Sequence, residues 1–132
     1  PAGLTTDEIR YGVSKIKELC DVHGRDFDTI DIAPQIGIMM RNSSEEAHRT
    51  YRNSQHYKHG ISLSKSTYKG RDIENYAARR MVGSPDEVLQ RINDYIEAGV
   101  TQFAALLFAD NTLEESKDHM QHFAEEILPH FR

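Results

Sequence analysis

The sequence predicts a mixed α/β fold in which strands alternate with helices. Several segments carry apolar residues at helical spacing, and two others carry the patterns of strands. The expected order along the chain is helix, strand, helix, loop, helix, helix, strand, helix, which is typical of the α/β class. The 132 residues, 38% of them hydrophobic and 28% charged, suffice for a single domain with a core of its own.

The first expected helix begins after Thr5 and ends at Gly24. Thr5 supplies a capping hydroxyl, and Asp7 and Glu8 place acidic side chains in the first turn. Apolar residues then recur at helical spacing, namely Ile9, Val13, Ile16 and Leu19. The segment is therefore predicted to be an amphipathic helix that buries one side.

Residues 29–40 form the first expected strand, because apolar residues alternate along it. The apolar face consists of Ile30, Ile32, Ile36, Ile38 and Met40. The opposite face is small or polar, which suits a barrel interior or a ligand better than a packed helix. It consists of Asp31, Ala33, Gln35, Gly37 and Met39. Pro34 has no N–H to donate and therefore indicates a bulge or an edge position.

Three less regular segments follow this strand. A polar helix is expected from about residue 42 to residue 57, because Ser43 and Ser44 precede two acidic residues. Residues 58–70 are rich in serine and glycine and show no sustained period, which predicts a mobile loop of a length often found in lids. A short helix is expected over residues 72–81.

The strongest helix start in the sequence lies at Ser84. This residue is placed to cap a helix, with Pro85 at the first helical position and Glu87 at the capping-box position. The helix is expected to end at residues 98–99. Residues 100–108 then form an apolar run of strand length that is expected to be buried on both faces.

The last expected helix is capped within residues 110–112. Its buried side is expected to consist of Leu113, Met120, Phe123, Ile127 and Leu128. Two strands alone would leave unpaired backbone groups along both sheet edges. We therefore expect further strands to come from another copy of the chain or from sequence that precedes it.

Composition excludes several classes of function. With 16 basic and 21 acidic residues, the formal charge of −5 argues against a general nucleic-acid binder. No run of about 18 apolar residues is present, so no membrane span is expected. The single cysteine, Cys20, is expected to be a buried small apolar residue and cannot form an internal disulfide, which favours the cytoplasm.

Several segments of the chain resemble one known family. Residues 81–88 read Met-Val-Gly-Ser-Pro-Asp-Glu-Val, residues 95–100 read Tyr-Ile-Glu-Ala-Gly-Val, and residues 123–130 read Phe-Ala-Glu-Glu-Ile-Leu-Pro-His. Together with Phe103, their spacing resembles the C-terminal end of the luciferase-like monooxygenase family. Gly-Arg-Asp at residues 24–26 and Ser-Glu-Glu-Ala at 44–47 extend the resemblance, as do the first residues of the chain.

The resemblance implies a (β/α)8 barrel that uses reduced FMN or the deazaflavin coenzyme to oxidise or reduce a small organic substrate. A complete barrel of this kind needs about 250 residues. The chain is therefore expected to be the C-terminal part of such a barrel, a single partial domain over residues 1–132 that is inactive alone. The expected function is part of a flavin- or deazaflavin-dependent oxidoreductase or monooxygenase.

Barrel enzymes place their chemistry at the carboxyl ends of strands, which here correspond to residues 39–42 and 107–111. Arg41 is a candidate to hold a phosphate or carboxylate, and Asp110 to orient a substrate or cofactor ring. The competing interpretations are a surface charge for Arg41 and a helix cap for Asp110. Gln35 and Met39 complete the set of candidate lining residues, because both lie on the small or polar face of the first strand. No general base is assigned.

Other candidate groups have simpler interpretations. Arg79 and Arg80 precede the helix start at Ser84 and form a second candidate anion site, but the acidic residues of that first turn favour structural capping. His56 with His59, and His119 with His122, place pairs of imidazoles on one helix face. No further ligand completes a metal site, so these histidines are expected to be exposed and no metal is expected.

A second function class remains open from the sequence. The chain is then a non-enzymatic α/β module that forms homo-oligomers through its exposed strand edges and binds a small ligand or another protein. Phosphate-loop, dinucleotide-binding and α/β-hydrolase motifs are all absent from the sequence. We accordingly expect a small-molecule substrate and a homo-oligomer, with no nucleic-acid or membrane partner.

Overall fold

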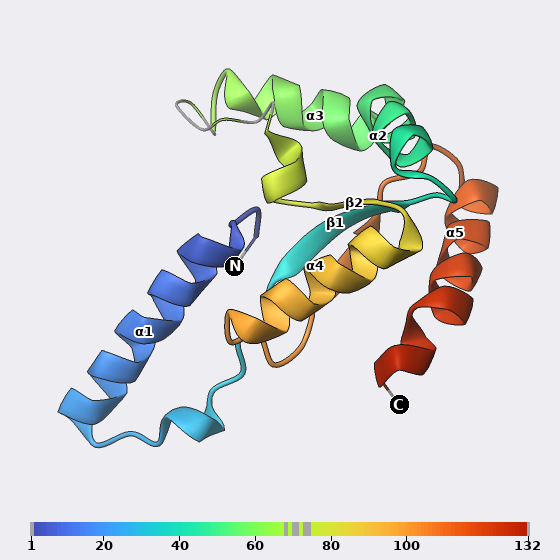
Figure 1. Cartoon of the computed structure of the whole chain (residues 1–132). Coiled ribbons are helices and arrows are strands. Elements are labelled where there is room, and N and C mark those ends of the chain that lie inside the picture. Colours follow the sequence, from blue (N-terminus) through green and yellow to red (C-terminus); the bar gives the residue numbers. More distant parts are fainter. Residues whose placement is uncertain (1, 68, 70–71, 73–74, 132) are drawn as a thin grey trace.

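A three-stranded parallel sheet organises the computed structural model, which describes residues 2–67, 69, 72 and 75–131. Its strands are β1 (Gln35–Met40), β2 (Met81–Gly83) and β3 (Ala105–Phe108), in the order β2-β1-β3 (Figure 1). Strand β1 is therefore the central strand, with Ile38 opposite Met81 on one side and Ile36 opposite Leu106 on the other. The predicted α/β class is confirmed.

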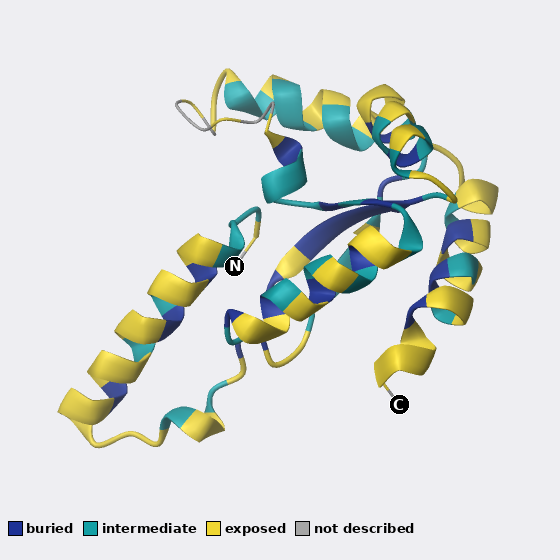
Figure 2. Ribbon diagram, viewed as in Figure 1, coloured by how far each residue is buried: buried dark blue, intermediate teal, exposed yellow. Residues whose placement is uncertain are grey.

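One face of β1 supports the larger hydrophobic core. Ile36, Ile38 and Met40 point to this face and are completely buried. They pack with apolar residues from three helices: α1 (Thr6–His23), α4 (Pro85–Glu97) and α5 (Leu113–Glu126). The buried stripe of α1 faces the sheet in Figure 2. The alternating isoleucines therefore predicted the core side of the strand correctly.

The opposite face of β1 supports a second, smaller cluster. Met39 is completely buried there, against Ala47 and Tyr51 of α2 (Ser44–Asn53) and Tyr76 of the 3₁₀ turn η2 (Tyr76–Ala78). Helices thus cover both faces of the sheet (Figure 1). Aromatic rings pack against this face, although the small and polar residues of β1 on this side suggested that it faces a barrel interior or a ligand.

The helix starts follow their capping residues. Ser84 and Glu87 form the predicted capping box at the start of α4, and Thr5, predicted to cap α1, forms another with Glu8. Helix α5 begins with a third capping box, made by Thr112 and Glu115. Capping contacts are local in sequence, which is why the residue pattern located the three helix starts.

The expected strands differ in extent from those observed. Only Gln35–Met40 of residues 29–40 is a strand, and Phe27–Thr29 forms a 3₁₀ turn, η1. Pro34 precedes β1 and accepts a hydrogen bond from the amide of Ala104, so β1 is neither bulged there nor an edge. Strand β3 is shorter than residues 100–108 and is an edge strand, with Leu107 39% exposed, so the expectation of burial on both faces was wrong.

Strand β2 was not predicted. Its three residues are too few to show a period, and they pair because they reach the free side of β1. The predicted helix over residues 72–81 is also wrong where the chain is described, because that part contains the 3₁₀ turn η2 and the start of β2. Residues 73–74 of that prediction lie outside the described residues.

The loop predicted over residues 58–70 is wrong over its first half. Helix α3 (Gln55–Ser64) occupies those positions, capped by Ser54, whose hydroxyl accepts a hydrogen bond from the amide of Tyr57. The single polar helix expected over residues 42–57 is correspondingly divided into α2 and α3. Residues 65–67 and 69 lie in turns, and residues 68 and 70 lie outside the described residues.

The buried side of α5 also differs from its prediction. Leu113, Met120 and Leu128 are exposed, whereas Phe123 and Ile127 are buried as expected. The third residue of the stripe is His119, which lies four residues before Phe123. The buried face of α5 therefore contains a histidine, although only apolar residues were expected there.

The strand order bears on the expected barrel. If β1, β2 and β3 were three consecutive barrel strands, β2 would lie between β1 and β3, because each barrel strand lies beside the one before it. In the described residues β1 takes that position, and no closed barrel is present. None of the described helices is both long enough and apolar enough to cross a membrane.

The turn after α4 provides a test of the packing. Gly99 has a φ of +97°, and a Cβ placed on it would lie 3.2 Å from Cγ1 of Val13. Gly99→Ala should therefore lower the free energy of unfolding by about 1–3 kcal/mol, as measured by chemical denaturation. Gly12→Ala is the matched control: it lies within α1 with open space around it, and alanine there should stabilise the helix by up to about 1 kcal/mol. Equal effects of the two substitutions would contradict the packing of α1 on this turn.

Candidate functional site

Two of the predicted site residues meet at the carboxyl ends of β1 and β3. Arg41 directly follows β1, and Asp110 lies two residues after β3. A guanidinium nitrogen of Arg41 lies 2.5 Å from Oδ1 of Asp110. The Asp110 side chain is fully buried, whereas the Arg41 side chain is 21% exposed. The pairing of β1 with β3 brings the two charges together from positions 69 residues apart.

His119 of α5 is the third member of this site. Its Nδ1 lies 2.8 Å from Oδ2 of Asp110, and its Nε2 accepts a hydrogen bond from the amide of Met40 at 2.9 Å. Because Nε2 accepts, the proton of the neutral ring lies on Nδ1 and is donated to Asp110. The ring also packs edge-on against Phe108. His119 therefore links α5 to both strands, and the expectation that it is exposed was wrong.

The partners of Asp110 determine its charge. Burial raises the pKa of this carboxyl, but the hydrogen bonds from His119 and Arg41 outweigh burial and hold the pKa below its usual value. Asp110 is thus a charged acceptor at neutral pH, with both oxygens engaged. It does not cap α5, because Thr112 performs that role. The helix-cap interpretation of Asp110 is therefore wrong.

Arg41 borders an open depression of about 520 Å³ at this edge of the sheet. The other residues that line it are Thr50, Glu115, Asp118, His119 and His122. Two of these are acidic, and Asp110 already balances the charge of Arg41. The depression therefore suits a neutral polar group better than a phosphate. Among the described residues that line the depression, Arg41 is the only arginine or lysine, and its charge is balanced by Asp110.

The other two predicted site residues lie elsewhere. Gln35 is exposed at the amino end of β1, opposite to Arg41, and borders a smaller cavity with Gly37 and Arg80. Met39 is completely buried in the aromatic cluster on the second face of the sheet. The four candidates therefore fall into three places, and only Arg41 and Asp110 are brought together.

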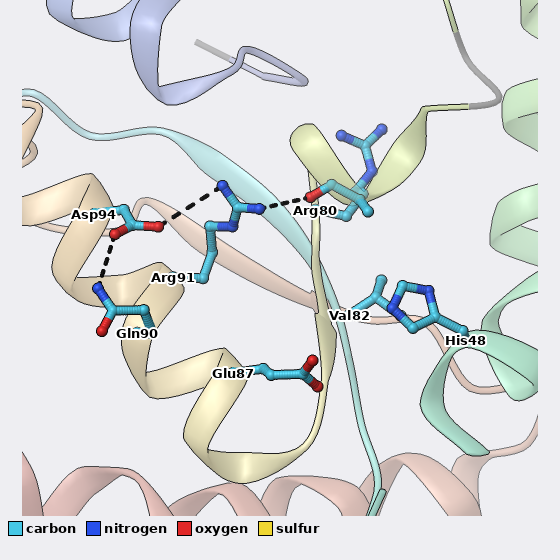
Figure 3. Close-up of a pocket in the computed structure, with 8 residues that line it drawn as sticks. His48, Arg80, Val82, Glu87, Gln90, Arg91 and Asp94 are labelled. Atoms are coloured by element: carbon cyan, nitrogen blue, oxygen red, sulfur yellow. Dashed lines mark hydrogen bonds and ion pairs between the residues drawn. The ribbon is translucent and has the colours of Figure 1, made fainter. Parts of the chain in front are cut away.

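A further cavity, of about 310 Å³, lies beside β2. His48 reaches it from α2, and Glu87, Arg91 and Asp94 reach it from α4 (Figure 3). Most of these groups already have partners. Glu87 accepts from Ser84 and Ser44, Arg91 donates to the carbonyl of Ala77, and Asp94 accepts from Gln90. The contacts of Glu87 with Ser44 and of Arg91 with Ala77 therefore hold α4 to its neighbours, whereas the contact of Gln90 with Asp94 lies within the helix.

His119 was the functional group that the sequence interpretation missed. The pair His119 and His122 suggested an exposed face, whereas the spacing of His119, Phe123 and Ile127 by four residues marks the buried one. This four-residue spacing would have identified His119 as a buried residue. Within the described part of the chain, no group of three or more potential metal ligands gathers in one place. Cys20 is buried and free, as expected.

The fold of this chain is similar to parts of several solved structures. No protein-family model matches the chain, and no curated protein matches it. Among solved structures, the coenzyme F420-dependent tetrahydromethanopterin reductase of Methanopyrus kandleri matches 99% of this chain and 44% of its own, at 19% identity and a TM-score of 0.66. The monooxygenase RslO1 of Streptomyces bottropensis matches 100% and 40%, at 21% identity and a TM-score of 0.75.

A riboflavin lyase, RcaE, solved with a modified FMN and riboflavin, matches 97% of this chain and 36% of its own, at 16% identity and a TM-score of 0.65. These neighbours have the luciferase-like monooxygenase fold, so the resemblance seen in the sequence is confirmed at the level of the fold. The chain spans less than half the length of each of them.

Asp110→Asn tests the buried network. The substitution leaves Arg41 without its counter-charge, and we expect the free energy of unfolding at pH 7 to fall by about 3 kcal/mol. This value is at the lower end of the loss of stability expected for a broken buried ion pair, because the Arg41 side chain remains partly exposed to water. Since the folded pKa of Asp110 lies below its unfolded value, its contribution is complete above the unfolded pKa and is lost as the pH falls through the folded pKa.

Chemical denaturation at a series of pH values between 7 and the acid limit of the fold measures this difference. The difference in the free energy of unfolding between wild type and Asp110→Asn should become smaller below about pH 4. Asp118→Asn, an exposed change nearby, should alter stability by less than about 0.5 kcal/mol at every pH. A gap for Asp110→Asn that does not change with pH would contradict the charged state assigned to this carboxyl.

Proposed function

We propose that this chain is part of a flavin- or deazaflavin-dependent oxidoreductase or monooxygenase that acts on a small organic substrate. The single observation that carries the proposal is the fold match along 97–100% of the chain to the three neighbours described above. One neighbour is named for coenzyme F420, one is a monooxygenase, and one was solved with a modified FMN. The resemblance implies a (β/α)8 barrel for the complete protein, in which β1 and β3 would be neighbouring barrel strands and β2 would not lie between them.

The position of Arg41 and Asp110 supports the proposal. Parallel α/β proteins bind ligands outside the carboxyl ends of their strands, and both residues lie at that edge. A bound flavin or deazaflavin would supply the hydride or the activation of oxygen. Because the charge of Arg41 is already balanced, we assign to it a neutral polar oxygen of the cofactor ring or the substrate. The phosphate would need groups from outside this edge.

Asp110 and His119 have a positioning role in this proposal. His119 holds one carboxylate oxygen of Asp110, and the other oxygen fixes the direction of the Arg41 guanidinium. The Nε2 of His119 is occupied by the amide of Met40, so this ring is not assigned a proton-transfer role. The network would therefore orient a donor at the edge of the site and keep its charge neutralised.

Fluorescence titration of the 132-residue chain with FMN and, separately, with the deazaflavin coenzyme tests the proposal. We expect saturable binding of one of the two at micromolar concentration. Arg41→Lys keeps the charge but removes the planar fork, and should weaken that binding about tenfold. The matched control is Arg49→Lys on the exposed side of α2, which should change it less than about twofold. Binding of neither cofactor, or equal effects of the two substitutions, would contradict a cofactor role for this edge.

A second candidate function rests on a different observation. Within the described residues, the outer sides of β2 and β3 pair with no other strand. Such edges favour association with another strand. The chain would then be a non-enzymatic module that completes its sheet as a homo-oligomer and binds a small ligand or protein.

Sedimentation velocity over a range of protein concentrations distinguishes this candidate. Association through β3 should produce a dimer that Leu107→Lys dissociates, because a charged side chain blocks an edge strand. Leu19→Lys, at an exposed position of α1, should leave the dimer intact. A monomer at all concentrations, or a dimer that both substitutions dissociate equally, would exclude edge pairing through β3.

A further inference from the structure

Arg80 lies where three cavities meet, near the amino ends of β1 and β2. It directly precedes Met81, the first residue of β2, and its side chain crosses β1 at Gly37. A Cβ placed on Gly37 would lie 2.7 Å from Cδ of Arg80 and 2.9 Å from Cε1 of His56. A side chain at position 37 would collide with both, so the observed position of Arg80 requires a glycine there.

The guanidinium of Arg80 has few partners. One terminal nitrogen donates to the carbonyl of Arg79 at 2.8 Å. The Nε atom is buried without a hydrogen-bond partner. No carboxylate of the described residues lies within ion-pair distance of Arg80, whereas Arg79 beside it pairs with Glu8. A buried donor without a partner is costly, and charged ones most of all.

The cavity beside this guanidinium has a volume of about 200 Å³. Its polar lining includes Gln35, His56, His59 and Arg80, and Leu63 and Leu107 provide apolar walls. No acidic residue lines it, nor the small cavity of about 30 Å³ that shares His56 and Arg80. The electrostatic character of this space is therefore that of a cationic pocket.

His56 adds a second donor to the pocket. Its Nδ1 lies 3.0 Å from the hydroxyl of Tyr51. When Tyr51 donates to that nitrogen, the proton of the neutral ring lies on Nε2, which makes no hydrogen bond to a described residue. Burial and the neighbouring charge of Arg80 lower the pKa of His56. The neutral ring with a free Nε2–H is thus favoured beside Arg80.

We propose that Gly37, His56 and Arg80 form a binding site for the carboxylate or phosphate group of a small organic anion. Arg80 offers the planar fork that matches such oxygens, and an anion that draws the guanidinium toward the cavity would also give Nε a partner. Gln35 lies at the mouth as a neutral donor. The apolar walls would hold the body of the ligand, and the volume of about 200 Å³ accommodates a group about the size of a benzoate.

This site is separate from the carboxyl-edge site and does not rest on the proposed cofactor. Gly37 precedes Arg41 by four residues of strand, which corresponds to about 13 Å. The Arg41 charge is balanced by Asp110, whereas Arg80 has no counter-charge among the described residues. The predicted structural capping at the start of α4 is confirmed by the capping box of Ser84 and Glu87, and Arg79 is engaged by Glu8 and the carbonyl of Gly3.

Proton–nitrogen NMR of the labelled 132-residue chain tests the proposal through the side-chain Nε–H of Arg80. The chain is titrated with sodium phosphate and, separately, with sodium benzoate, at constant pH and ionic strength. We expect a saturable shift of this signal with at least one of the two anions, and the responding anion identifies the phosphate or carboxylate class. No shift with either anion would overturn the proposal.

Matched substitutions separate a built site from general charge attraction. Arg80→Gln should abolish binding, and Arg80→Lys should weaken it about tenfold because the charge remains without the fork. Arg25→Gln removes one positive charge at an exposed position and should change affinity less than twofold. Gly37→Ala tests the site without altering charge and should also weaken binding. If Arg25→Gln weakened binding as much as Arg80→Lys and Gly37→Ala do, the site would be refuted.

Discussion

The burial of β1 on both faces and its pairing along both edges is the constraint on which the rest of the structure depends. Ile36, Ile38 and Met40 require apolar helices on one side, and α1, α4 and α5 supply them. Met39 requires a cover on the other side, and α2 with η2 provides it. Apart from Gln35 at its amino end, every residue of β1 is buried, so polar groups near the strand must find partners within the protein.

Charged groups at the two ends of β1 meet this requirement differently. At the carboxyl end, the side chain of Asp110 is fully buried, and its charge is tolerated because Arg41 and His119 engage both of its oxygens. At the amino end, Arg80 is drawn against Gly37 and its Nε finds no partner within the described residues. The charges of Arg41 and Asp110 balance each other at the carboxyl end. At the amino end, Arg80 keeps an N–H donor that has no partner among the described residues. The two sites proposed above differ in ligand for this reason.

Local features of the fold were predictable from the sequence, and long-range features were not. The ends of α1 and α4 follow from Thr5 with Glu8 and Ser84 with Glu87, because a capping contact spans only three residues. Strand β2 forms by pairing with β1 some 40 residues earlier, which no short pattern records. The meeting of Arg41 and Asp110 was predictable as two strand ends, whereas His119 joins them only because α5 turns that side inward. Arg80 gains its role from Gly37, a contact that sequence spacing does not reveal.

The pairing of β1 with both other strands is the claim that is tested most directly by backbone nuclear Overhauser effects in the labelled chain. We expect cross-strand contacts between Ile38 and Met81 and between Ile36 and Leu106, with none between β2 and β3. Contacts between β2 and β3, without contacts between β1 and β3, would show that β2 lies between the other two strands. That result would separate Arg41 from Asp110 and contradict the site built on them.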